Sequence, residues 1–413
     1  MKVIIAGGGI GGLVAALSLH AAGIACEVFE ATPEVRALGV GINLQPHSVR
    51  ELIELGLGEQ LAQIGVPTQE FVYANRFGQV IWREPRGLAA GYRWPQYSIH
   101  RGRLQVMLWE AAVQRLGADR VQPGRRLVGF EQDALGVTAR FLDGGQARGE
   151  VLVAADGIHS AVRQQFFPAE GLPKWNGALL WRAVSVAPPY LTGASMVQAG
   201  HRDRKFVCYP IGRTGDGRCI INWIAEQRFP TDATWAREDW NRQGQVSDFL
   251  PLFQGWNFGW LDVPALIRGT EAVYEFPMVD RDPLPWWTQG RVTLLGDAAH
   301  PMYPIGSNGA SQAILDARIL ARELATQPGW AAGLASYEAL RRPATAAVVQ
   351  ANRGDGPDRV MDVVHERAPE GFTRLEDVVQ PGELEAIIMG YKRTAGMDPA
   401  TLNARESWSV ARR

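Results

Sequence analysis

Residues 2–23 read KVIIAGGGIGGLVAALSLHAAG and carry three structural signals in a fixed order. The short apolar run from Lys2 to Ala6 is typical of a buried strand, and a glycine cluster ends it. From Gly12 to Gly23 apolar residues recur as on a buried helix, with Gly23 as its C-terminal cap. Residues 26–30 follow as a second strand. This order predicts two parallel strands with a helix packed on one face of the sheet.

The glycine cluster has the spacing of a dinucleotide-binding fingerprint. Gly7, Gly9 and Gly12 follow a strand and open a helix, which is the context that this fingerprint requires. The glycines permit a tight turn, and the helix N-terminus offers free N–H groups to a pyrophosphate. Glu30, at the end of the next strand, can accept hydrogen bonds from both ribose hydroxyls of an adenosine. Its charge would repel a ribose phosphate, so the site favours FAD or NAD over NADP.

Two later apolar runs are each followed by a pair of an aspartate and a glycine, and these two segments favour FAD over NAD. Residues 151–155 lead into Asp156-Gly157, and residues 291–295 lead into Gly296-Asp297. A glycine-containing loop, residues 304–310, follows the second pair and enters a helix near Ser311. Such a loop supplies N–H groups to an oxygen-rich ligand, and a carboxylate before it can hold a ribityl hydroxyl. The alternative interpretation is that both aspartates merely cap helices.

The middle of the chain has a different pattern. Residues 177–188, 204–211, 218–227 and 271–279 are rich in Val, Ile, Trp, Tyr and Phe, which predicts antiparallel strands. Between about 232 and 270, aromatic residues that include Trp235 and Trp240 recur near helical spacings. Residues 310–352 have a helical pattern with a break near residues 328–329, and a mixed helical tail follows residue 354.

Composition excludes several classes of function. The 413 residues carry 42 Lys and Arg against 43 Asp and Glu, a net charge of −1, which argues against a nucleic-acid partner. Three cysteines without close spacing predict a reducing compartment, and no motif supports a metal site. The apolar N-terminal stretch is too rich in glycine for a membrane span and lacks a signal-peptide cleavage site. We therefore expect a cytoplasmic protein without a membrane or metal partner.

Together the three glycine–acid blocks resemble the class A, single-component FAD-dependent aromatic hydroxylases of the para-hydroxybenzoate hydroxylase type. The resemblance spans roughly residues 1–350. Residues 38–43, 97–101, 155–163 and 277–284 (LGVGIN, YSIHR, ADGIHSAVR and PMVDRDPL) are similar to the 5-methylphenazine-1-carboxylate monooxygenases within that family.

The resemblance implies a fold and its domains. We expect an α/β protein with a discontinuous Rossmann-like FAD-binding domain, an inserted, mainly antiparallel β-sheet substrate domain and a C-terminal helical segment. Its FAD-binding domain would comprise residues 1–70, 98–175 and 276–353. The substrate domain would comprise residues 71–97 and 176–275, and the helical segment residues 354–413. A homodimer is a further expectation of this family.

The resemblance also implies roles for single residues at the cofactor. Glu30 would bind the adenosine ribose, Asp297 the ribityl chain, and Arg101 would lie against the pyrophosphate. Asp156-Gly157 would serve both FAD and the transient nicotinamide donor, NADH or NADPH. The remaining residues expected beside FAD, in addition to the three fingerprint glycines, are Val40, Gly41, Ile42, Leu127, Pro304, Gly309 and Ala310.

Candidates for the substrate side are mostly aromatic. They are Asn43, Trp181, Tyr209, Trp223, Met302 and Tyr303. Asn43 stands where some relatives that hydroxylate phenolic acids carry a histidine, which puts histidine-assisted deprotonation there in doubt. The glycine-containing loop of residues 304–310 reads Ser307-Asn308-Gly309 where many relatives have Gly-Gln-Gly. Strand aromatics are more often core than contact residues.

No residue stands out as an acid, base or nucleophile, because the family's chemistry occurs at the flavin. Tyr209 and Tyr303 are weak candidates for a hydroxyl partner. We expect His100, His159 and His300 to orient loops rather than to catalyse.

The sequence therefore predicts a monooxygenase that uses NAD(P)H and O2 to hydroxylate a small planar aromatic acid or N-heterocycle. By resemblance the substrate is phenazine-like, the oxidant is a flavin C4a-hydroperoxide, and a carboxylate could be lost during hydroxylation. One alternative is another FAD enzyme such as a halogenase, although Trp286-Trp287 does not match the Trp-x-Trp-x-Ile-Pro motif of that class. Another is a non-catalytic FAD-bound protein that captures an aromatic ligand.

Overall fold

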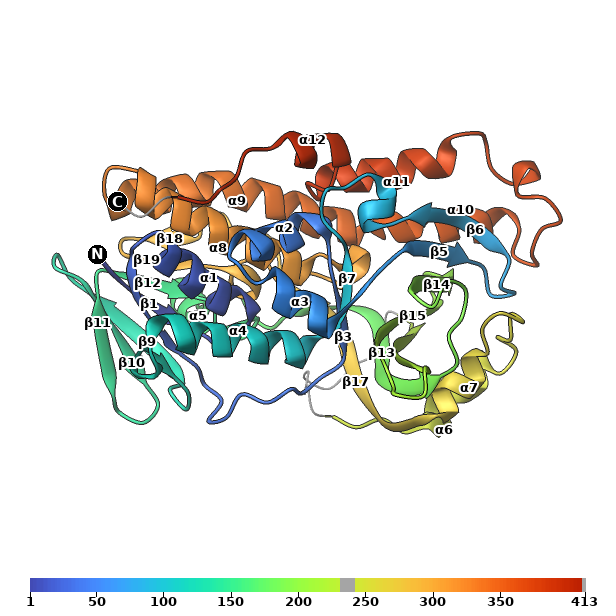
Figure 1. The fold of residues 1–413 in the computed structure, drawn as a ribbon, viewed down its shortest axis with the longest axis horizontal. Coiled ribbons are helices and arrows are strands. Elements are labelled where there is room, and N and C mark those ends of the chain that lie inside the picture. Colours follow the sequence, from blue (N-terminus) through green and yellow to red (C-terminus); the bar gives the residue numbers. More distant parts are fainter. Residues whose placement is uncertain (231–241, 411–413) are drawn as a thin grey trace.

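The computed structural model describes residues 1–230 and 242–410, and four β-sheets organise this part of the chain (Figure 1). The first sheet has six strands, in the order β18 (Thr288–Gln289), β19 (Val292–Leu294), β12 (Val151–Ala154), β1 (Lys2–Ala6), β2 (Ala25–Phe29) and β8 (Val121–Gln122). All neighbours pair in parallel except β18 and β19. The predicted parallel strands of residues 2–6 and 26–30 are therefore confirmed.

Helices pack around this sheet and position its glycine loops. Helix α1 (Ile10–Ala21) follows β1 directly and packs against α4 (Arg101–Leu116) and α8 (Gly309–Thr326). Helix α9 (Trp330–Arg353) lies alongside α8, and the two are separated by the predicted break. Nine of the twelve residues of α1 are buried, so it is a core helix. The parallel strands beside it are continuous apolar runs because both of their faces are covered.

A seven-stranded sheet forms the second large layer. Its order is β17 (Thr270–Asp280), β13 (Lys174–Ala187), β16 (Cys219–Arg228), β15 (Arg204–Arg213), β14 (Ser195–His201), β5 (Glu70–Ala74) and β6 (Val80–Pro85). Only β14 and β5 pair in parallel. This sheet confirms the expected, mainly antiparallel unit. One of its faces packs on α6 (Val246–Phe249) and α7 (Val263–Arg268), where Phe249 and Phe253 are fully buried. Trp235 and Trp240 lie outside the described residues.

Two smaller sheets had no clear sequence signal. One consists of β9 (Leu127–Gln132), β10 (Val137–Phe141) and β11 (Gln146–Gly149), and the other of β3 (Gly41–Leu44), β4 (Gly65–Pro67) and β7 (Tyr97–His100). The second of these packs beside the seven-stranded sheet. Strands β4 and β7 contact β15, and Tyr209 Oη on β15 donates to Gly41 O on β3. The helices near it are α2 (Pro46–Glu54) and α3 (Gly58–Ile64).

The C-terminal segment is helical, as expected, and crosses back over the seven-stranded sheet. It contains α10 (Arg359–Arg367), α11 (Glu383–Thr394) and α12 (Pro399–Ala404), and α10 contacts β5, β6 and β14. The remaining helices are α5 (Ala161–Phe166) and the 3-10 turns η1 (Gly87–Ala90), η2 (Ala118–Arg120), η3 (Leu250–Phe253), η4 (Gly296–Ala298), η5 (Ile305–Ser307), η6 (Gly356–Asp358) and η7 (Leu375–Asp377). Among the residues described, no helix combines the length and the apolar character needed to cross a membrane.

The packing of α1 gives a direct test of this fold. Leu17 is 0% exposed in the main core, whereas Leu135 is 82% exposed in the turn between β9 and β10. We expect Leu17→Ala to lower the free energy of unfolding by about 2–5 kcal/mol, because it leaves a cavity. Leu135→Ala should change it by less than about 0.5 kcal/mol. Urea unfolding followed by circular dichroism measures both, and equal losses would contradict the burial of α1.

Candidate active site

A cavity lies between the carboxyl ends of the parallel strands and one face of the seven-stranded sheet. It encloses about 610 Å³, within the range of small-molecule sites. Its cofactor-side lining includes most of the residues that the sequence singled out: Gly9, Val40, Gly41, Ile42, Arg101, Gly157, Asp297, Pro304, Gly309 and Ala310. Its sheet-side lining includes Asn43, Tyr209, Met302 and Tyr303. Gly7, Gly12, Glu30, Leu127 and Asp156 are not among the lining residues.

The glycine fingerprint forms a backbone surface that a ligand can approach. A Cβ atom on Gly12 would lie 2.0 Å from Gly7 O, and one on Gly7 would lie 2.2 Å from Ala155 O. Because of these close contacts, neither Gly7 nor Gly12 can be replaced by a residue with a side chain. The backbone can then turn tightly, and α1 begins shortly after β1. At Gly9, in contrast, a Cβ would meet nothing within 4 Å, so the N-terminus of α1 opens onto the cavity. Free N–H groups at this position suit a pyrophosphate.

Glu30 lies beside the fingerprint at the end of β2. Its Oε2 accepts a hydrogen bond from Gly8 N–H at 2.6 Å, and its Oε1 accepts one from Thr32 N–H at 2.8 Å. The carboxylate is half-buried and therefore reachable by a ribose. Leu127 is buried in the main core at the start of β9 and is separate from the cavity lining.

The two aspartates of the later loops differ in their surroundings. Asp156 Oδ2 accepts from Ala161 N–H at 2.8 Å, which caps α5, while its Oδ1 is buried without a hydrogen-bond partner in the described part of the chain. Burial raises the pKa of Asp156, against the lowering effect of the bonds from Ser160 and Ala161. Asp297 lines the cavity, and burial raises its pKa also. Asp297 is exposed to the cavity, and Asp156 is half-buried with one oxygen that has no partner among the described residues. Both carboxylates can accept hydrogen bonds from a ligand with hydroxyl donors, such as a ribityl chain.

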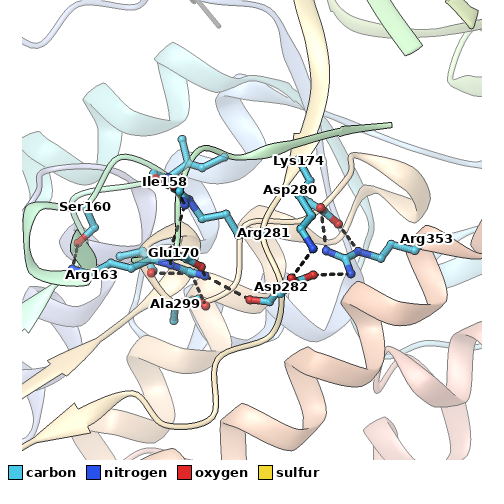
Figure 2. A network of polar contacts seen from close by, with 12 residues as sticks. Ile158, Ser160, Arg163, Glu170, Lys174, Asp280, Arg281, Asp282, Ala299 and Arg353 are labelled. Carbon is cyan, nitrogen blue, oxygen red and sulfur yellow. Dashed lines mark hydrogen bonds and ion pairs between the residues drawn. The ribbon is translucent and has the colours of Figure 1, made fainter. Parts of the chain in front are cut away.

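A buried arginine network connects these two loops, as Figure 2 shows. Arg163 donates to Ala298 O at 3.1 Å and to Ala299 O at 2.9 Å, and it pairs with Glu170. Arg281 donates to Ile158 O at 3.1 Å and also pairs with Glu170. The network therefore holds the Asp156 loop against the Asp297 loop. The sequence analysis gave Arg163, Glu170 and Arg281 no role.

A second ion-pair group in Figure 2 continues from this network. Arg353 on α9 donates to both oxygens of Asp280, at 2.7 and 2.9 Å, and to Asp282 Oδ1 at 2.9 Å. These bonds tie the end of β17 to α9, so the seven-stranded sheet is fixed relative to the helices of the cofactor side.

Two histidines near the motifs have structural contacts. His100 Nδ1 accepts from Arg103 N–H at 3.4 Å at the start of α4. His300 Nε2 lies 2.5 Å from Asp316 Oδ2, and Arg341 pairs with the other oxygen of that carboxylate. Both arrangements orient loops beside the cavity.

The predicted substrate contacts of two tryptophans are wrong. Trp181 and Trp223 belong to the core between the sheet and α6, and neither is among the cavity-lining residues. Trp181 Nε1 donates to Glu275 Oε2 at 3.0 Å, and Trp223 Nε1 donates to Ser185 Oγ at 2.9 Å. Side chains alternate along a strand, so their neighbours Leu180, Arg182 and Ile224 face the cavity instead.

Arg182 and Tyr209 converge on Gly41 at the junction of the two sides. Arg182 Nη2 and Tyr209 Oη each donate to Gly41 O at 2.9 Å, and Gly41 N–H donates to Asn222 Oδ1 at 2.7 Å. A Cβ at Gly41 would lie within 2.8 Å of both Asn222 and Tyr209, so only glycine fits. Burial raises the pKa of Tyr209 to about 12, which keeps its phenol neutral.

Two buried donors at this junction lack partners. Arg182 Nε and Asn43 Nδ2 have no hydrogen-bond partner within the described residues, although Asn43 Oδ1 accepts from Ser98 Oγ at 2.7 Å. Both side chains line the cavity. Unpartnered buried donors are costly, and together they fit a ligand that brings acceptor oxygens.

Comparison with known proteins agrees with this geometry. The family model described as "FAD binding domain" matches residues 1–248 and 255–352. Phenazine 1,6-dicarboxylic acid hydroxylase PhzS of Lysobacter antibioticus is 47% identical over 363 residues, covering 85% of this chain and 89% of that protein. Aurachin C monooxygenase/isomerase of Stigmatella aurantiaca is 34% identical over 83% of this chain and 85% of that protein.

A solved structure extends the agreement to the fold. Klebsiella pneumoniae HpxO complexed with FAD and uric acid superimposes with a TM-score of 0.78 at 27% identity, covering 97% of this chain and 98% of that one. The chain therefore belongs to the FAD binding domain family, and within it to the FAD-dependent aromatic monooxygenases that use NAD(P)H.

Proposed function

We propose that the chain hydroxylates a planar aromatic carboxylate of the phenazine type, with loss of a carboxylate as one possible outcome of the same reaction. The observation that carries this proposal is the buried Arg182, which lines the cavity and whose Nε has no hydrogen-bond partner among the described residues. A carboxylate on the substrate would give Arg182 Nε its missing partner. The 47% identity to a phenazine dicarboxylic acid hydroxylase supports the choice of ring system.

On the cofactor side the chain's task is to hold FAD. Bound FAD supplies the redox chemistry, which is hydride uptake from NAD(P)H and activation of O2. The N-terminus of α1 would hold the pyrophosphate, Asp297 the ribityl chain, and residues 40–42 and 304–310 would lie beside the flavin ring. The Arg163 network keeps the loops that carry these groups at a constant separation.

On the substrate side the chain's task is to orient the ring and to exclude water. Val207, Ile224 and Phe276 supply an apolar wall, and Arg182 would anchor the carboxylate. The Tyr209 hydroxyl is already engaged with Gly41 O and stays protonated, so it positions the 41–43 strand rather than moving a proton.

The domain division follows the same proposal. Residues 1–70, 98–175 and 276–353 would bind FAD, residues 71–97 and 176–275 would bind substrate, and residues 354–413 would form the C-terminal helical segment. The homodimer implied by the family resemblance stays a prediction.

Flavin reduction tests the proposed activity first. We expect NADH or NADPH to reduce the FAD-loaded protein faster, in the absence of oxygen, when phenazine-1-carboxylate is present. The reason is that the bound carboxylate is expected to favour the state in which the flavin can be reduced. Stopped-flow absorbance measures the rate, and mass spectrometry after adding air identifies the product. If no phenazine, quinoline or hydroxybenzoate carboxylate accelerates reduction or is oxygenated, the proposed substrate class is wrong.

The glycine fingerprint can be tested through FAD affinity. Gly12→Ala places a Cβ 2.0 Å from Gly7 O and should displace the α1 N-terminus. We expect the Kd for FAD, measured by flavin fluorescence quenching, to rise about tenfold or more. Gly255→Ala is the matched control, because a Cβ there meets nothing within 4 Å. An unchanged Kd in Gly12→Ala would contradict pyrophosphate binding at this site.

Substitutions at Arg182 and Trp223 test which face of the seven-stranded sheet binds the substrate. Arg182→Met should raise the Kd for phenazine-1-carboxylate by about tenfold to a hundredfold, because it removes the only partner proposed for the carboxylate. Trp223→Phe alters the opposite face and should leave that Kd within about twofold while lowering stability. Flavin absorbance titration measures both constants. The reverse pattern would place the substrate on the tryptophan face.

A further inference from the structure

A second group of charged residues lines the cavity away from Arg182. Lys205 on β15 and Glu226 on β16 stand directly opposite each other in the sheet register, and Asp358 ends η6 above them. Lys205 Nζ lies 2.7 Å from Asp358 Oδ2 and 3.3 Å from Glu226 Oε2. All three are buried, with 5% exposure or less. We call these three residues the distal cluster.

The sheet register separates Lys205 and Glu226 from the glycine loops, while η6, which carries Asp358, contacts η5 of the 304–310 loop. Lys205 and Tyr209 share a face of β15, four residues apart, and Tyr209 contacts Gly41 beside the glycine loops. At about 3.3 Å per residue, the two ends are separated by about 13 Å. Arg182 pairs with Ile224 in the register, one row nearer to the cofactor side than Glu226. A tricyclic acid bound to Arg182 would therefore direct one edge of its ring system toward the distal cluster.

The distal cluster has more negative than positive charge. Burial opposes the charge on Lys205, but Asp358 and Glu226 outweigh it and raise its pKa, so Lys205 is an ammonium. Asp362, also buried, adds another acidic group nearby, with a pKa raised by burial to about 6. Arg228, two residues from Glu226 on β16, lies 3.8 Å from Asp203. Burial raises the pKa of Glu226, and Lys205 opposes this rise. The cluster therefore places two acidic groups against one ammonium.

We propose that Glu226 and Asp358, on either side of Lys205, act as a charge filter that excludes a second carboxylate from the distal end of the cavity. The filter selects an aromatic monoacid whose far edge is neutral or carries a hydrogen-bond donor such as a hydroxyl, amino or ring N–H group. This inference rests on the proposed function, because it assumes that Arg182 takes the first carboxylate.

The physical basis is the cost of adding like charge to a buried site. A second carboxylate at the distal end would meet Glu226 and Asp358 in a poorly hydrated environment, where such repulsion is weakly screened. A hydrogen-bond donor at the same position would instead find carboxylate acceptors.

Equilibrium binding of two probes tests the filter. We expect phenazine-1-carboxylate to bind the FAD-loaded protein about tenfold or more tightly than phenazine-1,6-dicarboxylate. Titrations followed by flavin absorbance at about pH 8 keep both ligands ionised and favour the ionised form of the acidic side chains. In Glu226→Gln, which preserves shape and removes one negative charge, the ratio of the two Kd values should fall to about threefold or less. Asp358→Asn is a second variant with the same expected direction.

Glu275→Gln is the matched control. Glu275 is buried on the same sheet but contacts Trp181 on the opposite face, so its loss of charge should leave the ratio of Kd values unchanged. Thermal unfolding of each variant verifies that it is folded. Equal affinities of the two probes in the parent protein, or a ratio that neither distal variant changes, would overturn the filter. Failure of both probes to bind or to accelerate reduction would instead contradict the proposed function.

Discussion

The close contact between the glycine loop and the strand ends is the constraint on which the rest of the structure depends. A Cβ atom on Gly12 would clash with Gly7 O, and one on Gly7 would clash with Ala155 O, so neither position can carry a side chain. This contact allows α1 to start immediately after β1 and brings its N-terminus to the cavity. The Arg163 network adds the other two loops to the same edge, because Arg163 bonds to the carbonyl oxygens of Ala298 and Ala299 and Arg281 bonds to that of Ile158.

Sequence reasoning succeeded where the signal was local. The strand from Lys2 to Ala6, the helix after it and the loops at Asp156 and Asp297 are each defined within a few residues by apolar runs and glycines. It failed on the orientation of the central strands. Trp181 and Arg182 are adjacent, and only the position of α6 on one face of the sheet determines which of them lies in the core. A strand buried on both faces has no clear alternation to reveal this choice.

The buried charges of the cavity illustrate a second limit. Lys205 and Glu226 stand within largely apolar strands, which marks them as unusual, since charged residues are rarely buried without partners. The partner Asp358 lies 153 residues along the chain from Lys205, in the C-terminal segment. Arg353 and Asp280 are similarly distant, 73 residues apart. Such pairs are created by the tertiary fold, and no spacing rule within one sequence predicts them.

The two sides of the cavity therefore depend on different kinds of interaction. The cofactor side is made of backbone groups and glycines, whose replacement disturbs the parallel sheet itself. The substrate side is made of side chains on antiparallel strands whose backbone hydrogen bonds do not depend on which residue faces the cavity. A change at Glu226 or Lys205 alters charge at the distal end while leaving the glycine loops untouched. This separation explains how one FAD-binding framework can accommodate relatives named for acting on phenazine, aurachin and hydroxybenzoate compounds.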